Sequence, residues 1–181
     1  KPEWLEENFR INTTSLMYLA HELIPDMIKN KKGVIIVTGN TAAKRGVAST
    51  PYFAPTKAAQ RILAQSLAKD FGPKGIHVAY LIIDAFINTP WTRSRIKQQI
   101  NQPDIIFCQP KDIAEEIYHI APQKRSAWSF DVDLVIYLIL SSQVLYPFPC
   151  MLSMECKSTP TFFFFDPEEG MEEEEVVDNT L

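Results

Sequence analysis

Lys57 is the residue of this 181-residue chain whose position best fits a chemical role. It lies near the start of a predicted helix, directly after a polar loop that leaves a buried strand. Ligands of open parallel sheets bind beyond the carboxyl ends of the strands, so a lysine there would meet them. The alternative is an ordinary solvated lysine. The loop, residues 38–51, also carries Asn40 and Thr41.

Two apolar runs flank this loop and helix. Residues 34–37 are continuously apolar and residues 76–83 nearly so, with His77 inside the run, which is typical of parallel strands buried on both faces. Apolar residues recur at helical spacing between the runs, and Gly72 and Pro73 end the helix. Residues 33–83 are therefore predicted to form a βαβ unit with parallel strands and a right-handed crossover.

The same stretch resembles the short-chain dehydrogenase/reductase family. Lys57, Gly39, Gly46 and the run GPKGIHV over residues 72–78 match the family pattern. The resemblance implies a Rossmann-type fold and hydride transfer between NAD or NADP and a small carbonyl or alcohol. It also implies that Lys57 binds the cofactor ribose and lowers the pKa of a catalytic tyrosine.

The tyrosine position of the family pattern is Phe53, four residues before Lys57. The serine position, thirteen residues earlier, is Asn40. Tyr52 is an alternative hydroxyl, although position 52 is rotated by about 100° from position 53 on a regular helix. Pro55 leaves this alternative open, because residues before a proline are often not helical.

Residues 2–30 are predicted to form a long helix from their apolar spacing. The resemblance implies that Asn12 on this helix is the family's catalytic asparagine, which shapes a helix bend and holds a water in the proton relay. The alternative is an ordinary polar residue on a helix.

The segment after the second strand also follows the family pattern. The resemblance implies that Ile87 and Thr89 contact nicotinamide, although Asp84 and Ala85 replace the usual Pro-Gly. Residues 91–108 would form a substrate flap, which could equally be a mobile surface helix. An amphipathic helix is expected over residues 110–121, and the last core strand over residues 126–132.

Charge and cysteine usage restrict the class of protein. The formal net charge is −4, yet residues 166–178 hold eight acids and no base, so 18 bases and 14 acids remain elsewhere. That mild basicity could favour an anionic cofactor or be ordinary surface charge. The three cysteines form no CxxC pair, which argues against a metal site or disulfides and favours a cytoplasmic protein. No nucleic-acid partner is indicated.

We therefore expect a partial α/β Rossmann-like domain of three αβα layers with a parallel sheet over residues 1–133, and a disordered tail over residues 134–181. No glycine-rich phosphate turn occurs in the sequence, so the chain is expected to lack the amino-terminal half of the fold and to expose a strand edge. Residues 134–152 carry no charge, and a membrane span there is the less favoured alternative.

Three functions stay open at this point. The first is an NAD- or NADP-dependent oxidoreductase, inactive as this chain alone because the tyrosine and the glycine-rich turn are absent. The second is a non-catalytic interaction protein, a homodimer through the helices at residues 3–29 and 54–71, which the resemblance implies pair across a dimer axis. The third is a membrane-attached fragment.

Overall fold

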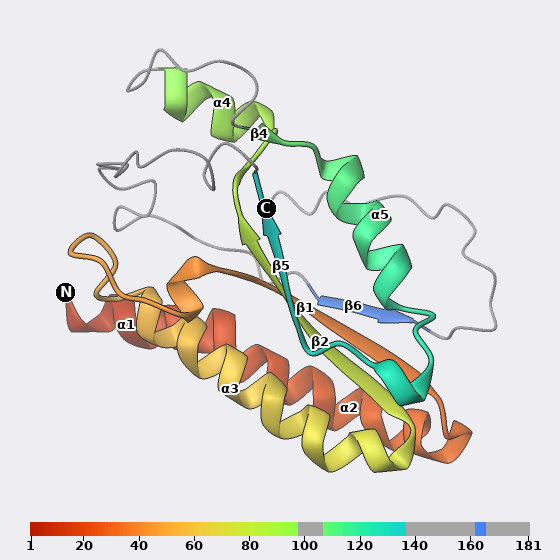
Figure 1. The fold of residues 1–181 in the computed structure, drawn as a ribbon. Coiled ribbons are helices and arrows are strands. Elements are labelled where there is room, and N and C mark those ends of the chain that lie inside the picture. The colour runs from red at the N-terminus through yellow and green to blue at the C-terminus, as the bar shows by residue number, and fades with distance from the viewer. Residues whose placement is uncertain (98–106, 137–161, 166–181) are drawn as a thin grey trace.

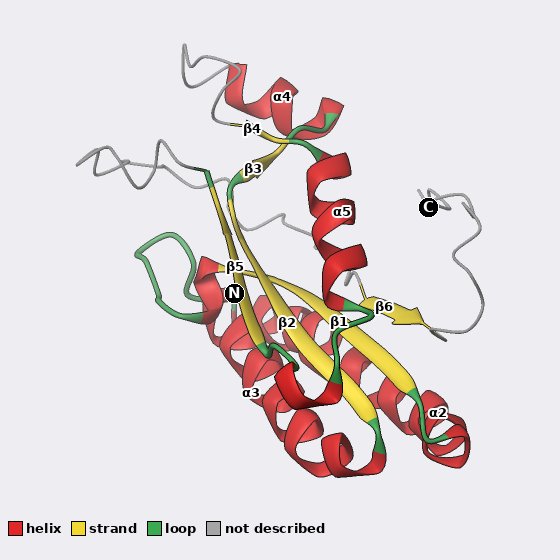
Figure 2. Ribbon diagram, turned by 45° about the vertical axis from the view of Figure 1, so that its right-hand side comes forward, coloured by secondary structure: helices red, strands yellow, loops and turns green. Residues whose placement is uncertain are grey.

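The structure, a computed structural model, describes residues 1–97, 107–136 and 162–165. A twisted sheet lies at the centre (Figure 1). Two long helical stretches cover one face of the sheet, and a shorter helix covers the other (Figure 2). This arrangement confirms the predicted α/β class with a parallel sheet.

The first helical stretch is continuous but not uniform. It consists of α1 (Pro2–Phe9), a π-helical turn (Arg10–Thr14) and α2 (Ser15–Asn30). Within α2, Leu16, Ala20 and Ile24 recur every four residues and are buried against the sheet. The helix predicted over residues 2–30 is thus confirmed, with a π-helical turn inside it.

The predicted βαβ unit is present. Strands β1 (Gly33–Asn40) and β2 (Ile76–Asp84) are parallel, in a register that runs from Gly33 opposite Ile76 to Asn40 opposite Ile83. The connecting helix is α3 (Ala54–Phe71). Both strands are buried over nearly their whole length, which explains their continuous apolar character.

The other face of the sheet is covered by α5 (Pro110–Ile120). Its buried side chains pack on alternate residues of β1 and β2; they are Ile113, Ile117 and Ile120. The amphipathic helix expected over residues 110–121 is therefore confirmed.

The last parallel strand begins later than expected. The strand predicted over residues 126–132 is β5, and it spans Asp131–Val135 beside β2. The preceding residues form a short 3₁₀ turn and a loop, because Trp128 stacks on His77 and donates its indole N–H to the carbonyl of Gln123 at 2.8 Å. This tertiary contact outweighs the local strand propensity.

The edge of β1 is not exposed, contrary to our expectation. Strand β6 (Phe162–Phe165) pairs antiparallel with Val34–Val37, so the sheet order is β5-β2-β1-β6. The prediction of a disordered tail over residues 134–181 is therefore wrong for these four residues, and for residues 134 and 135, which belong to β5. An unpaired row of strand N–H and C=O groups favours such pairing. The stretches 137–161 and 166–181 lie outside the described residues.

Beyond the end of β2 the chain forms a small extension. Strands β3 (Phe86–Ile87) and β4 (Phe107–Cys108) pair in parallel, and α4 (Pro90–Lys97) follows β3. The connection between α4 and β4, residues 98–106, lies outside the described residues and is part of the predicted flap over residues 91–108. No helix in the described part of the chain is long and apolar enough to cross a bilayer; most of the uncharged stretch 134–152 falls outside that part.

Candidate functional site

Lys57 points back to the carboxyl end of β1. Its side chain leaves the first turns of α3, and its ammonium nitrogen donates to the carbonyl oxygen of Thr38 at 3.1 Å. Only 6% of Lys57 is exposed, so this is not a solvated surface lysine. The ammonium group therefore has a fixed position beside the strand end, where a ligand of such a sheet would bind.

Phe53 lies one helical turn before Lys57. The backbone N–H of Lys57 donates to the carbonyl of Phe53 at 3.1 Å, which fixes their spacing. The ring of Phe53 is buried, at 6% exposure, and clusters with Ala42 and Ala54. The ring thus fills space between the start of α3 and the loop after β1, but it carries no group that can donate or accept a proton.

Tyr52 faces in another direction. Its ring lies edge-on to Trp4 of α1, with the ring centroids 5.7 Å apart. Tyr52 is only half-buried, whereas Phe53 is buried. The structure therefore places the Tyr52 ring on α1, away from the cluster that holds Phe53.

Asn40 ends β1 and starts the loop. Its side-chain oxygen accepts a hydrogen bond from the backbone N–H of Ala42 at 3.1 Å, which caps the 3₁₀ turn Thr41–Ala43. Through Ala42 this turn contacts Phe53. Asn40 therefore shapes the loop against the start of α3.

Asn12 lies in the π-helical turn and is fully buried. The turn is defined by the N–H of Ser15, which bonds to the carbonyl of Arg10, five residues earlier. The Asn12 amide nitrogen donates to the hydroxyl of Thr56 on α3 at 3.0 Å. Such π-helical turns occur often at functional sites, and this one joins the first helical stretch to the residue before Lys57.

A buried network that the sequence reasoning missed extends this contact. Gln60 donates its amide to the Asn12 carbonyl at 2.6 Å and accepts from the Tyr80 hydroxyl at 3.1 Å. Thr56 donates its hydroxyl to the Phe53 carbonyl at 2.7 Å. A signal was present, because Gln60 precedes the buried Ala64 by four residues on the apolar face of α3.

Burial keeps Tyr80 protonated. Desolvation raises the pKa of its hydroxyl well above the ordinary value, because the ionised form would lie in the core. Gly39 makes room for the ring, since a Cβ atom there would lie 2.1 Å from a Tyr80 ring carbon. Tyr80 is therefore a structural residue, which holds Gln60 in place from the core, rather than a proton donor.

Ile87 and Thr89 lie on the extension after β2. Ile87 belongs to β3 and packs on the α5 side of the core. The Thr89 hydroxyl accepts from the backbone N–H of Thr92 at 3.1 Å, so it caps α4. The structure thus joins Asn12, Phe53 and Lys57 in one cluster with the loop of Asn40, while Ile87 and Thr89 form a separate group beyond β2.

Asp84 ends β2 where the family pattern has proline. Burial raises the pKa of its carboxyl group above the ordinary value, and the nearby Asp133 adds to this effect. Arg45 and Lys44 oppose it. The carboxyl ends of β1 and β2 therefore form a charged rim, on which Lys44 and Asp133 make an exposed ion pair at 2.8 Å.

Comparison with known proteins agrees with this geometry. The sequence profile described as "short chain dehydrogenase" matches residues 1–100, more than half of the chain. This segment contains all the candidate site residues discussed above.

Curated relatives resemble the chain over part of their length. An uncharacterized oxidoreductase of Bacillus subtilis, YmfI, is 27% identical over 128 residues, which are 67% of this chain and 52% of the relative. The 3-oxoacyl-[acyl-carrier-protein] reductase FabG of Buchnera aphidicola is 32% identical over 92 residues, 51% of this chain and 37% of the relative. The chain thus spans about half the length of these relatives, or less.

Solved structures share the fold. A short-chain dehydrogenase from Rhodopseudomonas palustris has a TM-score of 0.58 at 26% identity, covering 74% of this chain and 52% of that one. An NADPH-bound short chain oxidoreductase from Pseudomonas aeruginosa PAO1 with an atypical catalytic center has a TM-score of 0.66 at 17% identity, covering 75% and 57%. The Rossmann-like part of the fold prediction is therefore confirmed, and the chain belongs to the short-chain dehydrogenase/reductase family.

Proposed function

We propose that this chain carries the lysine side of an NAD- or NADP-dependent oxidoreductase site that has lost its tyrosine proton donor. The observation that supports this most is the geometry of Lys57 and Phe53. The lysine is buried and held at the carboxyl end of β1, and an aromatic ring without a hydroxyl occupies the position one turn before it. The substrate would be a small carbonyl compound or alcohol.

The residues of the chain fit one part of the cofactor. When bound, NAD or NADP supplies or accepts the hydride. The Lys57 ammonium group, which is held at the carboxyl end of β1, would donate hydrogen bonds to the ribose hydroxyls, and Ile87 and Thr89 would contact nicotinamide. The glycine-rich turn that binds the pyrophosphate is absent from the 181 residues, so this chain alone is expected to hold the cofactor weakly.

Proton delivery is the step for which the site is incomplete. Reduction of a carbonyl group forms an alkoxide, which must receive a proton in or near the transition state. A tyrosine next to a lysine can deliver this proton, because the positive charge stabilises the phenolate that remains once the proton has passed to the alkoxide. Phe53 retains the ring but lacks the acidic hydroxyl. We therefore propose that the chain does not reduce carbonyl compounds at an appreciable rate.

Cofactor binding tests the first part of this proposal. NADPH and NADH would be titrated by calorimetry into the 181-residue chain and into residues 1–135 joined behind a glycine-rich first half from a family relative. We expect no micromolar binding to the chain alone and recovery in the joined protein. Lys57→Met should weaken the recovered binding, while Lys69→Met, an exposed lysine on the same helix, should not. Equal affinity of both lysine variants would contradict a ribose-binding role.

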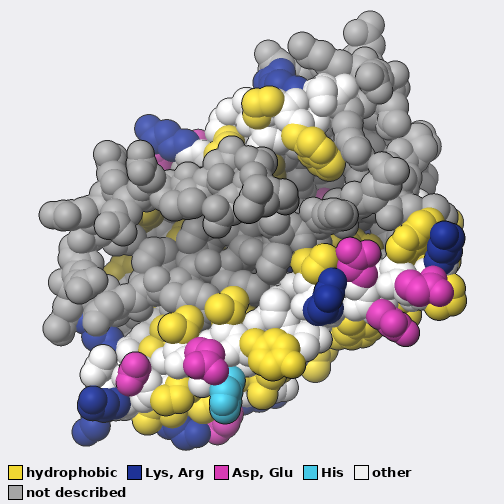
Figure 3. Space-filling model, turned by 180° about the vertical axis from the view of Figure 1, so that it is seen from behind, with side chains coloured by type: hydrophobic (Ala, Val, Ile, Leu, Met, Phe, Trp, Pro, Cys, Tyr) yellow, Lys and Arg dark blue, Asp and Glu magenta, His cyan; other side chains and the backbone are white. Residues whose placement is uncertain are grey.

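A second candidate function is self-association through the helical layer. Apolar side chains occur around α2, including the exposed Met17, Tyr18 and Leu23, and Ile62 is 54% exposed on α3. Figure 3 shows hydrophobic side chains scattered among charged ones over this layer. A helix that is apolar on more than one face favours burial against another surface.

Sedimentation velocity tests this second candidate. A dimer through α2 and α3 predicts that Met17→Glu and Ile62→Glu shift the chain toward monomer, because each buries a charge in the interface. Val47→Glu is the matched control, since Val47 is as exposed as Ile62 but lies in the loop after β1. A monomeric parent chain would refute this candidate.

A further inference from the structure

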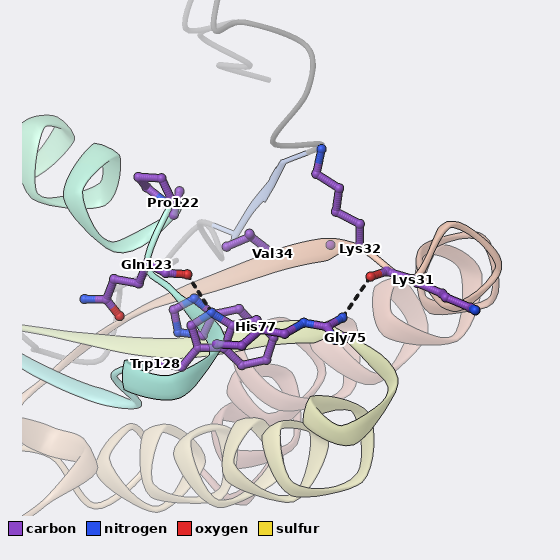
Figure 4. Close-up of a pocket in the computed structure, with 11 residues that line it drawn as sticks. Lys31, Lys32, Val34, Gly75, His77, Pro122, Gln123 and Trp128 are labelled. Atoms are coloured by element: carbon purple, nitrogen blue, oxygen red, sulfur yellow. Dashed lines mark hydrogen bonds between the residues drawn. The ribbon is translucent and has the colours of Figure 1, made fainter.

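A small cavity lies at the opposite end of the sheet from Lys57, where β1 and β2 begin (Figure 4). It is open to one side and offers about 150 Å³ between the end of α2, the end of α5 and the loop before β5. Pockets for drug-sized ligands measure about 300–1,000 Å³, so this one suits a side chain or a short piece of peptide rather than a nucleotide.

The cavity has a cationic rim. Lys31, Lys32 and Arg125 line it, and the described lining residues include no Asp or Glu. Lys31 takes a left-handed conformation, φ 53°, as it ends α2, and Arg125 donates a guanidinium N–H to its carbonyl at 3.0 Å. These contacts hold Arg125 at the cavity, where the combined positive charge favours carboxylate groups.

His77 adds an acceptor to the wall. Its Nε2 lies 2.8 Å from the carbonyl oxygen of Ser129, and since a carbonyl only accepts, Nε2 must carry the proton. Nδ1 is then an acceptor; it is buried, and the described protein atoms give it no hydrogen-bond partner. Trp128 stacks on the ring with the centroids 4.9 Å apart. A ligand that satisfies both Nδ1 and the rim must offer an N–H or O–H donor as well as negative charge.

Strand β6 ends beside this cavity. It runs antiparallel to β1 with Phe165 opposite Val34, so it ends at the start of β1, close to Lys32 (Figure 4). The thirteen residues that follow, 166–178, contain eight Asp or Glu and no Lys or Arg. An acidic peptide offers backbone N–H donors together with carboxylates, which is the combination that the cavity requires.

We propose that the acidic segment 166–178 of this chain docks on the cavity lined by Lys31, Lys32, Arg125 and His77. Its carboxylates would pair with the three cations, and one of its backbone N–H groups would donate to Nδ1 of His77. The docked segment would fasten β6 to the edge of β1. The stability of the β6–β1 pairing would then depend on ionic strength, because partly exposed ion pairs weaken as salt screens them.

A chain that ends at Phe165 provides the first test. A peptide of residues 166–178 would be titrated into this shortened chain and into the full chain, with NMR signals of Gly75, His77 and Trp128 as the readout. We expect the peptide to move the shortened chain's signals toward their full-chain positions and to leave the full chain unchanged. Equal binding to both chains would show that the segment does not occupy its own cavity, and would overturn the proposal.

Charge reversal in the full chain provides the second test, which does not depend on the folding of the shortened chain. Lys32→Glu should lower the amide-exchange protection of Phe162–Phe165 by about tenfold, the change that about 1.4 kcal/mol produces. It should do so at low salt, about 50 mM, and have little effect at about 500 mM. Lys29→Glu is the control, because Lys29 is exposed on α2 and does not line the cavity. Equal protection in the two variants at low salt would refute the docking.

Discussion

Replacement of Gln60 by leucine tests whether the buried polar network holds the site together. Gln60 is fully buried, and its amide bridges the Asn12 carbonyl at 2.6 Å and the Tyr80 hydroxyl at 3.1 Å. Leucine has a similar volume but cannot make either bond. The carbonyl in the π-helical turn and the hydroxyl in the core would then both lose a partner.

The magnitude follows from these two lost partners. A buried polar group left without its hydrogen bond costs about 1–3 kcal/mol, and leucine recovers part of that through its apolar surface. We therefore expect Gln60→Leu to lower the free energy of unfolding by about 2–4 kcal/mol. Urea unfolding followed by circular dichroism measures this change, with an unchanged slope as the sign that only stability has altered.

Two further variants make the test specific. Gln65→Leu makes the same chemical change at a half-buried position on the same helix and should stay within about 0.5 kcal/mol of the parent. Tyr80→Phe should cost about 1 kcal/mol in the parent and less in the Gln60→Leu background, where the hydroxyl keeps only its longer bond to the Lys57 carbonyl at 3.4 Å. If Gln60→Leu costs no more than Gln65→Leu, the network does not stabilise the site.

Two other predictions concern the core beneath the site and the distal cavity. Gly39→Ala should lower the free energy of unfolding by about 1–3 kcal/mol, because the new methyl group would overlap the buried Tyr80 ring. Gly46→Ala is the control, since a methyl group there meets open space and should be tolerated. Equal free energies of unfolding in the two variants would refute the close approach of Gly39 to Tyr80. Desolvation lowers the pKa of His77 below its ordinary 6.5, although its bond to Ser129 opposes this, so the unfolded chain takes up the proton more readily. The free energy of unfolding should accordingly fall as pH drops below 6.5, and in His77→Phe this part of the pH dependence should disappear; an unchanged pH profile would contradict it.

The βαβ unit could be predicted from the sequence because its signals are local. Continuous apolar runs mark β1 and β2, and apolar spacing marks α3, so burial alone determines these elements. The pairing of β6 could not be predicted, since four phenylalanines indicate strand propensity but not a partner more than 120 residues away. The delayed start of β5 depends likewise on the packing of Trp128 against His77.

The positions of the candidate site came from the family resemblance, except that the strand-end position by itself also indicated Lys57; their roles stay predictions. Lys57 has the strand-end position expected of it, and Asn12 is buried in a π-helical turn. Gln60 and Tyr80 were missed as a network: the spacing to Ala64 places Gln60 on the apolar face of α3, but the sequence does not show which residue a buried polar side chain bonds to. Their partners come from three different elements, and only the tertiary structure brings these together.

Turnover by a Phe53→Tyr variant tests the central claim most directly. The variant, its parent and Tyr52→Phe would each be built into residues 1–135 joined behind a glycine-rich first half, and NADPH and NADH oxidation would be followed with a panel of ketones and aldehydes. A hydroxyl restored next to Lys57 should raise kcat by at least about 10²-fold, the usual contribution of a positioned general acid, and Tyr52→Phe should change little. If instead the parent turns over and Tyr52→Phe abolishes that activity, Tyr52 is the proton donor and the proposed role of position 53 is wrong.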